Sequence, residues 1–232
     1  LAGIETKKYD FKQTAIVTNV TTQRPNNYTA YERFTPHGPI TFLPIGENRS
    51  VLVFTTLADE ANHYLGMSEE QYLETIETEF GRRLGKIQEI GKRRSYPIFF
   101  VEAIQQFQEN LVLLGNSAHT IHPNAAQGFN LGLRDVAGLA ECIYSALEKK
   151  LSVDNINILN AYLGLRNSDQ QRVTEFTNGI ATSFYNNSSL FTPITNTIML
   201  LFDCIPEFKY LFLKRAMGLA GYQPRLVRGL NL

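Results

Sequence analysis

Between residues 11 and 57, runs of β-branched and aromatic residues alternate with short groups of turn residues. These residue types favour extended strands, and strands joined by short turns form antiparallel meanders more readily than parallel units with crossover helices. We therefore expect an antiparallel sheet with strands at 11–20, 28–34, 39–45 and 50–57. Alternate residues of a strand face the same side, so one face of this sheet is expected to meet solvent or a ligand.

A helix is expected over residues 68–84, because this segment combines a start signal with helical periodicity. Ser68 and Gln71 have the spacing of a capping box, in which each side chain bonds the other residue's backbone N–H. Apolar residues then recur at helical spacing: Tyr72, Leu73, Ile76 and Phe80. The following segment 86–103 is strand-like, although Pro97 should confine part of it to a sheet edge or a bend.

The second half of the chain is predicted to be mostly helical. It begins with the apolar run 111–115, which is typical of a strand buried on both faces. One helix should extend from about Asn130 to Lys150, and a second should begin a few residues later. The apolar region 190–219 contains two prolines, so at least two shorter helices are expected there.

Composition places the chain among globular proteins, since 44% of its 232 residues are hydrophobic. The 22 basic and 22 acidic residues cancel, so the sequence gives no sign of a nucleic-acid partner. No signal peptide is recognisable, and charged residues interrupt the apolar clusters near the C-terminus before they reach the length of a membrane span. A cytoplasmic protein is expected.

The segment from residue 115 to residue 132 has more special residues than a connection from a strand to a helix needs. Gly115, Gly128 and Gly132 leave room for a ligand beside the backbone, and a helix start offers unpaired N–H groups. The simpler interpretations remain open at this point. The glycines could only allow packing, Asn116 could be a turn or cap residue, and an Arg134–Asp135 ion pair could be structural.

Two catalytic interpretations of this loop fit poorly. His119 and His122 have the spacing of a metal pair, but Pro123 follows directly and the loop supplies no third ligand. A triad of Ser117, His119 and Asp135 lacks the Gly-x-Ser-x-Gly turn that exposes a nucleophilic serine.

The stretch GNSAHTIHPNAAQGFNLGLRDVAGL at 115–139 resembles the second flavin-binding motif of class A flavoprotein aromatic monooxygenases. It is most similar to the UbiH/VisC/Coq6 family of ubiquinone-biosynthesis hydroxylases, and residues 31–45 and 82–98 resemble the branch that hydroxylates polyprenyl-methoxyphenols. The resemblance covers residues 1 to about 170. It implies an α/β (α+β) fold, the C-terminal part of a para-hydroxybenzoate-hydroxylase-like flavoprotein.

The resemblance also implies roles for individual residues. Asn116 stands where most of the family has an Asp that bonds the ribityl chain of FAD, and Pro123 would lie beside the flavin carbon that reacts with oxygen. Ala126 replaces the first glycine of the family's Gly-Gln-Gly. The implied cofactor-binding residues are Gly115, Asn116, Pro123, Gln127, Gly128, Phe129 and Asn130, with Pro123 also implied as the catalytic residue.

The implied activity is FAD- and NAD(P)H-dependent hydroxylation of a polyprenylated phenol. Phe34, His37 and Phe42 are expected either to line the substrate pocket or to be packed within the sheet. Apolar residues near the C-terminus are expected to be packed in the core or to contact the prenyl tail or the inner membrane: Phe202, Phe208, Tyr210, Leu211 and Phe212. Association with other proteins of ubiquinone biosynthesis is a further expectation.

Two motifs of the family do not occur in the chain. Neither the Gly-x-Gly-x-x-Gly fingerprint nor the Asp-Gly motif is found, so we expect a C-terminal portion that binds FAD weakly or not at all by itself. The expected division is a β-sheet substrate domain with one helix at 1–108, a flavin-domain strand, loop and helix at 109–150, and a helical region at 151–232. The alternatives are a non-catalytic module that binds a lipid or a partner, and a related flavin oxidoreductase such as a reductase or a halogenase.

Overall fold

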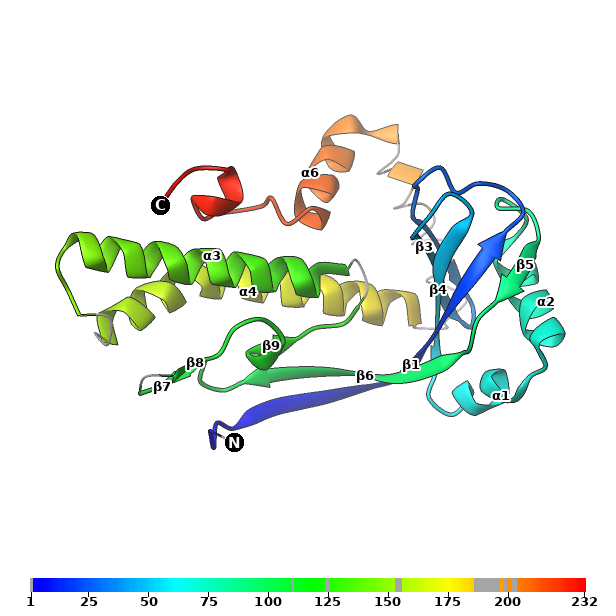
Figure 1. The fold of residues 1–232 in the computed structure, drawn as a ribbon, viewed down its shortest axis with the longest axis horizontal. Coiled ribbons are helices and arrows are strands. Elements are labelled where there is room, and N and C mark those ends of the chain that lie inside the picture. Colours follow the sequence, from blue (N-terminus) through cyan, green and yellow to red (C-terminus); the bar gives the residue numbers. More distant parts are fainter. Residues whose placement is uncertain are drawn as a thin grey trace. The chain divides into compact units, whose positions relative to one another are not determined.

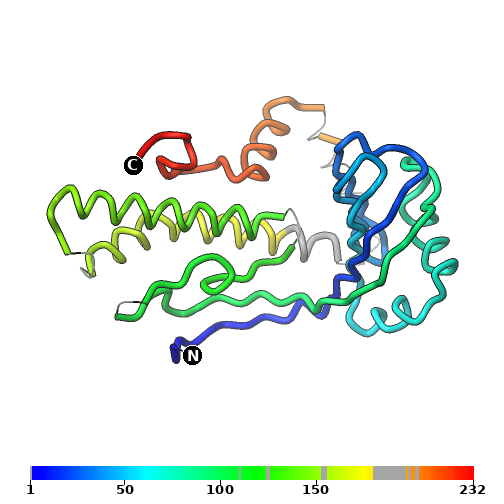
Figure 2. Tube along the Cα trace, viewed as in Figure 1, coloured from blue at the N-terminus to red at the C-terminus, as the bar shows by residue number. Residues whose placement is uncertain are grey.

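The computed structural model forms two compact units, one over Asp10–Ile98 and the other combining the segment up to Tyr9 with Phe99–Leu232. Figure 1 shows the elements of both units, and Figure 2 follows the same chain as a tube. The structure describes residues 2–109, 111–123, 126–152, 156–185, 197, 200–201 and 204–232, with side chains of the segment 156–185 up to residue 179.

The first unit contains the predicted antiparallel sheet, in the order β2-β3-β4-β1 with β5 also beside β1. The strands are β1 (Thr6–Thr22), β2 (Tyr31–Thr35), β3 (Gly38–Pro44), β4 (Arg49–Leu57) and β5 (Ile87–Ile90). The predicted antiparallel pairing is confirmed for β2–β3, β3–β4 and β4–β1. Only β2, β3 and β4 form a meander, because β1 pairs with β4 rather than with β2. Only β1 differs clearly from its expected bounds, because it begins before residue 11.

One face of this sheet carries the hydrophobic core of the unit. Phe54 is the cross-strand neighbour of both Ile16 and Ile40, and all three side chains are buried. Helices α1 (Ala61–Gly66) and α2 (Glu69–Phe80) contribute further members of this core, including Tyr64 and Tyr72. Burying an aromatic or large aliphatic side chain contributes about 1.5–3 kcal/mol, so this face accounts for most of the unit's stability.

Helix α2 begins where its capping box predicts, but it ends at Phe80, before the expected end at residue 84. Ser68 and Gln71 form the predicted capping box, with each side chain bonded to the other residue's backbone N–H. The helix ends at Phe80 because Gly81 has a φ of 86°, in a region that residues with a Cβ rarely adopt. Helix α1 was not expected, since its six residues lack a side-chain cap and are too few to show a periodic pattern.

The second unit combines short strands with long helices. The last part of β6 (Arg94–Ala103), a strand that includes Pro97, pairs with β9 (His119–Thr120), and β7 (Phe107–Gln108) pairs with β8 (Leu111–Val112). The buried strand expected at 111–115 is wrong for this structure. Leu111 is 42% exposed, and only two residues of the run pair with a neighbouring strand.

The long helices follow the flavin-like loop, as predicted. Helices α3 (Gln127–Glu148) and α4 (Ile156–Tyr185) run antiparallel and side by side (Figures 1 and 2), and α6 (Pro206–Ala216) follows. A 3-10 turn, η3 (Leu226–Arg228), lies near the C-terminus. Among the described residues, no helix combines the length and the apolar character needed to cross a bilayer.

Candidate functional site

The loop before α3 begins with a 3-10 turn, η1 (Gly115–Ser117), that packs closely against the helix. Gly115 has a φ of 55°, and a Cβ added to Gly132 would lie only 3.2 Å from the Gly115 Cα. A methyl group at either position would therefore strain the turn or separate it from α3. These two glycines have a packing role, whether or not the backbone of Gly115 also meets a ligand.

Several of the predicted cofactor residues in the loop and at the start of α3 are exposed. Asn116, Pro123 and Asn130 are exposed, and the Phe129 side chain is 76% exposed. Gly128 lies beneath Asn116, because a Cβ added to Gly128 would be 4.0 Å from the Asn116 Oδ1. The structure thus brings an accessible amide side chain next to a stretch of backbone without a side chain.

The start of α3 is suited to an electron-rich group. Ala126, which precedes the helix, has left-handed backbone angles with a φ of 50° and gives no side-chain cap. The first helical turn also contains no acidic residue that would compensate the positive end of the helix dipole. Its N–H groups therefore meet neither a capping oxygen from Ala126 nor a neighbouring carboxylate.

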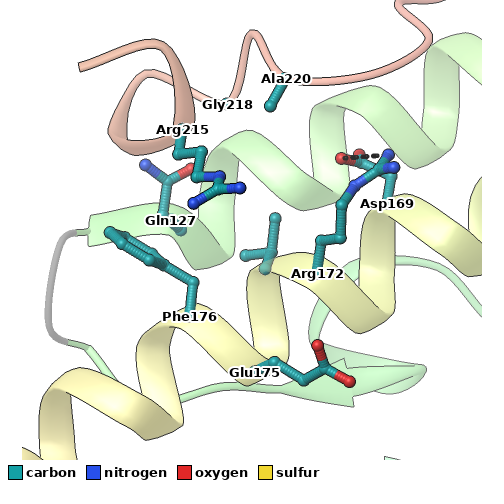
Figure 3. A pocket seen from close by; sticks show the side chains of 9 residues that line it. Gln127, Asp169, Arg172, Glu175, Phe176, Arg215, Gly218 and Ala220 are labelled. Atoms are coloured by element: carbon teal, nitrogen blue, oxygen red, sulfur yellow. Dashed lines mark ion pairs between the residues drawn. The ribbon is translucent and has the colours of Figure 1, made fainter. Parts of the chain in front are cut away.

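The side chain of Gln127, unlike those of the exposed residues, points into the protein. It is buried, its Nε2 donates to the backbone oxygen of Ala216, and its Oε1 has no hydrogen-bond partner among the described residues. The residue lines a cavity of about 350 Å³, where Phe176 of α4 and Arg215 of α6 lie near it (Figure 3). Any contact of Gln127 with a cofactor bound at the exposed residues would therefore involve its backbone.

Below the loop, a buried hydrogen bond joins β9 to α3. The Nε2 of His119 lies 2.6 Å from the Asp135 Oδ2, and the two side chains are 3% and 0% exposed. The other oxygen of Asp135 accepts hydrogen bonds from the Arg166 Nε and the Gln170 Nε2, each at 3.0 Å. Both oxygens of this carboxylate are therefore satisfied by α4 and by the loop.

Ionised groups continue from Asp135 along the interface of α3 and α4. The Asp169 Oδ2 lies 2.6 Å from the Arg166 Nη2 and 2.9 Å from the Arg134 Nε. The expected pair of Arg134 with Asp135 is thus wrong, because neighbouring residues on a helix point in different directions. We call His119, Arg134, Asp135, Arg166 and Asp169 the buried ion network.

This environment keeps Asp135 ionised. Burial alone would raise the pKa of Asp135, because a low-dielectric environment disfavours a charge. The hydrogen bond and charge of His119, the hydrogen bond from Gln170 and the charge of Arg166 outweigh burial and lower that pKa. Sequence reasoning missed the network, although the polar residues Arg166, Asp169 and Gln170 interrupt the apolar pattern of α4.

The serine of the rejected triad takes part in local structure only. The Ser117 Oγ donates to the Leu114 backbone oxygen at 2.7 Å and accepts from the Leu114 N–H at 3.2 Å. One ring nitrogen of His119 is bonded to Asp135, as in a triad, but its Nδ1 has no hydrogen-bond partner among the described residues, so Ser117 does not complete the set. Ser117 therefore stabilises the turn through Leu114, whereas His119 connects the loop to α3.

The expected substrate residues lie in three different settings of the first unit. Phe42 is 1% exposed, and its ring centroid lies 4.4 Å from that of Phe80, so its place is in the hydrophobic core rather than on a pocket wall. Phe34 is half-buried on the opposite face of the sheet, beside Pro39. His37 is exposed in the turn between β2 and β3. Substrate roles for Phe34 and His37 stay predictions.

A family of proteins described as "FAD binding domain" matches residues 2–177, which is most of the chain. The chain belongs to this family. Among curated relatives, it is 34% identical to "Ubiquinone hydroxylase UbiL" of Rhodospirillum rubrum, with 100% of the chain and 54% of the relative covered. It is 28% identical to "3-demethoxyubiquinol 3-hydroxylase" of Escherichia coli, with 94% of the chain and 56% of that protein covered. The chain spans about half the length of the curated relatives it matches.

Solved structures support the fold of this FAD-binding-domain protein. The p-nitrophenol 4-monooxygenase PnpA of Pseudomonas putida matches with a TM-score of 0.71 at 15% identity, over 95% of this chain and 57% of that chain. PqsL, described as a probable FAD-dependent monooxygenase from Pseudomonas aeruginosa, matches with a TM-score of 0.66 at 20% identity, over 79% and 51%. The expected fold of para-hydroxybenzoate-hydroxylase-like flavoproteins is confirmed.

The loop of this FAD-binding-domain protein fits part of a flavin cofactor. The uncapped helix start offers N–H groups to the electron-rich edge of the ring, and the exposed amide of Asn116 can bond a cofactor hydroxyl group. The Gly128 backbone beside Asn116 leaves space for a flat group. The fit does not include the Gln127 side chain, which is bonded to Ala216.

Proposed function

We propose that the full-length protein is a flavin-dependent monooxygenase that hydroxylates a polyprenylated phenol in ubiquinone biosynthesis, with NAD(P)H as reductant. The match to UbiL over the whole of this chain carries the proposal. The uncapped start of α3 and the exposed Asn116 support it independently, because they suit the edge of a flavin. When bound, FAD would supply the redox chemistry, accepting a hydride from NAD(P)H and activating O₂.

The residues of the chain would bind and orient the reacting groups. Asn116 would hold the polar chain of the cofactor, and Pro123 would present an apolar surface beside the ring. The backbone of residues 127–130 would stabilise negative charge on the reduced ring, as backbone N–H groups do for other anions. The sheet face that carries Phe34, opposite the helix-covered core, would form the floor of the substrate pocket.

The flavin content of the full-length protein tests this proposal. We expect the protein to be yellow as purified and to oxidise NAD(P)H faster when a short-chain prenylated phenol is added. Replacing Asn116→Leu should weaken FAD binding about tenfold, because a hydrogen bond to the cofactor is lost. Asn116→Asp, which introduces the residue common in the family, should retain affinity, and flavin fluorescence titration measures all three proteins.

Asn167→Leu is the matched control, since Asn167 is also exposed but lies within α4. A correctly folded full-length protein without flavin absorbance would contradict the proposal and favour the non-catalytic module instead. If the protein binds flavin but does not consume the prenylated phenol, the proposed cofactor stands and the proposed substrate is rejected.

We also propose that α6 contacts the inner-membrane surface from the cytoplasmic side. Tyr210, Leu211 and Leu213 are exposed on this helix, and Lys209, Lys214 and Arg215 give it basic character. A basic helix with exposed apolar residues is suited to an anionic lipid surface. Phe208 and Phe212 also belong to α6, whereas Phe202 lies outside the described residues.

Substituting Leu211→Glu should weaken binding to phosphatidylglycerol vesicles by about tenfold or more, because burial of one leucine is lost and a repelled charge is added. Leu147→Glu is the control, since Leu147 is an exposed leucine of α3 and the change in charge is the same. Vesicle co-sedimentation measures both variants. If both variants lose vesicle binding equally, or if the unchanged protein does not bind vesicles, α6 is rejected as the membrane-contacting helix.

A further inference from the structure

The buried ion network lies directly below the loop that would meet the flavin. His119 is midway in sequence between Gly115 and Pro123, and it is the member of the network that belongs to this loop. The other members lie on α3 and α4. The His119–Asp135 hydrogen bond therefore joins the loop to the helix whose first turn forms the other part of the candidate flavin site.

Ion pairs join the other four members of the network. Arg134 and Arg166 each contact Asp169, and Arg166 also contacts Asp135, so two guanidinium groups compensate two carboxylates. Arg172 is more distant from Asp169, at 3.9 Å, and is half exposed. The His119 Nε2 completes the network through its hydrogen bond to the Asp135 Oδ2 at 2.6 Å, and the geometry of this bond is the contribution of His119.

Two further hydrogen bonds of the loop act in other directions. The Thr120 Oγ1 donates to the Asn116 backbone oxygen, and the Ala103 N–H donates to that of Ala118. These bonds determine the shape of the loop and its position beside β6. Because the His119 bond runs to α3 instead, it restrains the loop along a different direction.

We propose that His119 is a positioning residue, which by donating to Asp135 fixes the loop at residues 115–123 against α3 and so places Asn116 and Pro123 relative to the first turn of that helix. Arg166 and Gln170 hold Asp135 from the other side and prevent it from turning with the loop. This inference rests on the proposed flavin function. Loss of the His119 bond would change the flavin environment even where the fold persists.

The test uses the full-length protein and two substitutions that differ in reach. In His119→Gln the amide nitrogen can occupy the position of the imidazole Nε2, whereas in His119→Asn it falls short, near the position of Nδ1. We expect the Gln variant to bind FAD within about threefold of the unchanged protein, and the Asn variant to bind it about tenfold more weakly, as for a lost hydrogen bond to a charged group. The visible circular dichroism of bound flavin should change only in the Asn variant.

Val173→Ala is the matched control for destabilisation. Val173 is buried in the cluster of Ile121 and Leu131, so its truncation should lower the melting temperature without cutting the His119 bond. The flavin spectrum of this variant should match that of the unchanged protein. If Val173→Ala reproduces the spectral change of His119→Asn, or if the Asn and Gln variants behave alike, the positioning role is rejected.

The outcomes separate this inference from the proposed function. An unchanged protein that binds no FAD rejects the flavin function itself. An unchanged protein that binds FAD, together with a folded Gln variant that does not, rejects only the role of the His119 donor. If the Asn variant fails to fold, the Gln variant still tests the inference. Unchanged FAD affinity and an unchanged flavin spectrum in the Gln variant support the positioning role of His119, and loss of either one rejects it.

Discussion

At the scale of single residues, Ala126 is in a conformation that disfavours alanine. Its φ of 50° brings the Cβ close to the following carbonyl group, which costs about 1–2 kcal/mol for a residue with a side chain. The related flavin motif has a glycine at this position. The chain therefore retains the backbone turn before α3 without the residue type that adopts it at least cost.

Replacing Ala126→Gly should stabilise the protein by about 1 kcal/mol, because relief of the left-handed strain exceeds the added freedom of the unfolded chain. Ala161→Gly, at an exposed position inside α4, should have the opposite effect and destabilise by about 1 kcal/mol. Urea unfolding followed by circular dichroism measures both. Destabilisation by Ala126→Gly would show that the turn does not limit stability.

Contacts of single residues differ in whether the sequence could predict them. The Ser68–Gln71 capping box was predictable because both partners lie within one turn of the same helix. The contact of Arg134 with Asp169 was not, since helical spacing within α3 does not identify the facing residue of α4. Phe42 was expected in a pocket from the family resemblance, but the resemblance does not show which face of the sheet the helices cover.

At the scale of elements, Asp135 connects β9, α3 and α4 through its two oxygens. Its lowered pKa has a defined consequence for stability. A carboxylate with a lower pKa in the folded state stabilises the fold above its ordinary pKa, and this contribution is lost as the pH falls through the folded value. Acid should therefore weaken the association of these three elements.

Substituting Asp135→Asn should destabilise the protein at neutral pH by about 3–5 kcal/mol, because Arg166 loses a buried charged partner. The variant should also lose less stability than the unchanged protein when the pH is lowered below about 4. Chemical unfolding at a series of pH values measures both effects.

Glu32→Gln serves as the control for the pH series. Burial beside the sheet raises the pKa of Glu32, although part of the side chain remains exposed, and the Thr41 hydrogen bond only partly opposes this shift. Its effect on stability therefore has the opposite sign and decreases stability as the pH rises. An acid-induced loss that is equal in Asp135→Asn and in the unchanged protein would contradict the role of Asp135.

At the scale of the whole molecule, sequence patterns predicted the sheet, α2 and α3 better than the setting of the run at 111–115. Strand alternation and helical spacing are properties of a single element, so they can be recognised in the sequence without knowing which elements pack against it. An apolar run instead implies that other elements cover both of its sides, and the sequence does not say which elements these are. Within the described part of the chain, β8 pairs with β7 alone, and Leu111 remains exposed.

Gly138, on α3, decides whether the Arg166 guanidinium can reach its two carboxylates. A Cβ added to Gly138 would lie 2.8 Å from the Arg166 Cδ, so the aliphatic part of the arginine fills the space that a methyl group would take. Gly138, which has no side chain, thus affects the placement of the ionised side chains of the buried ion network. A substitution as small as alanine there would displace the arginine and release Asp135 on one side. If His119 acts as proposed, the loop at residues 115–123 would loosen in turn, so weaker cofactor retention would originate at a position that has no side chain.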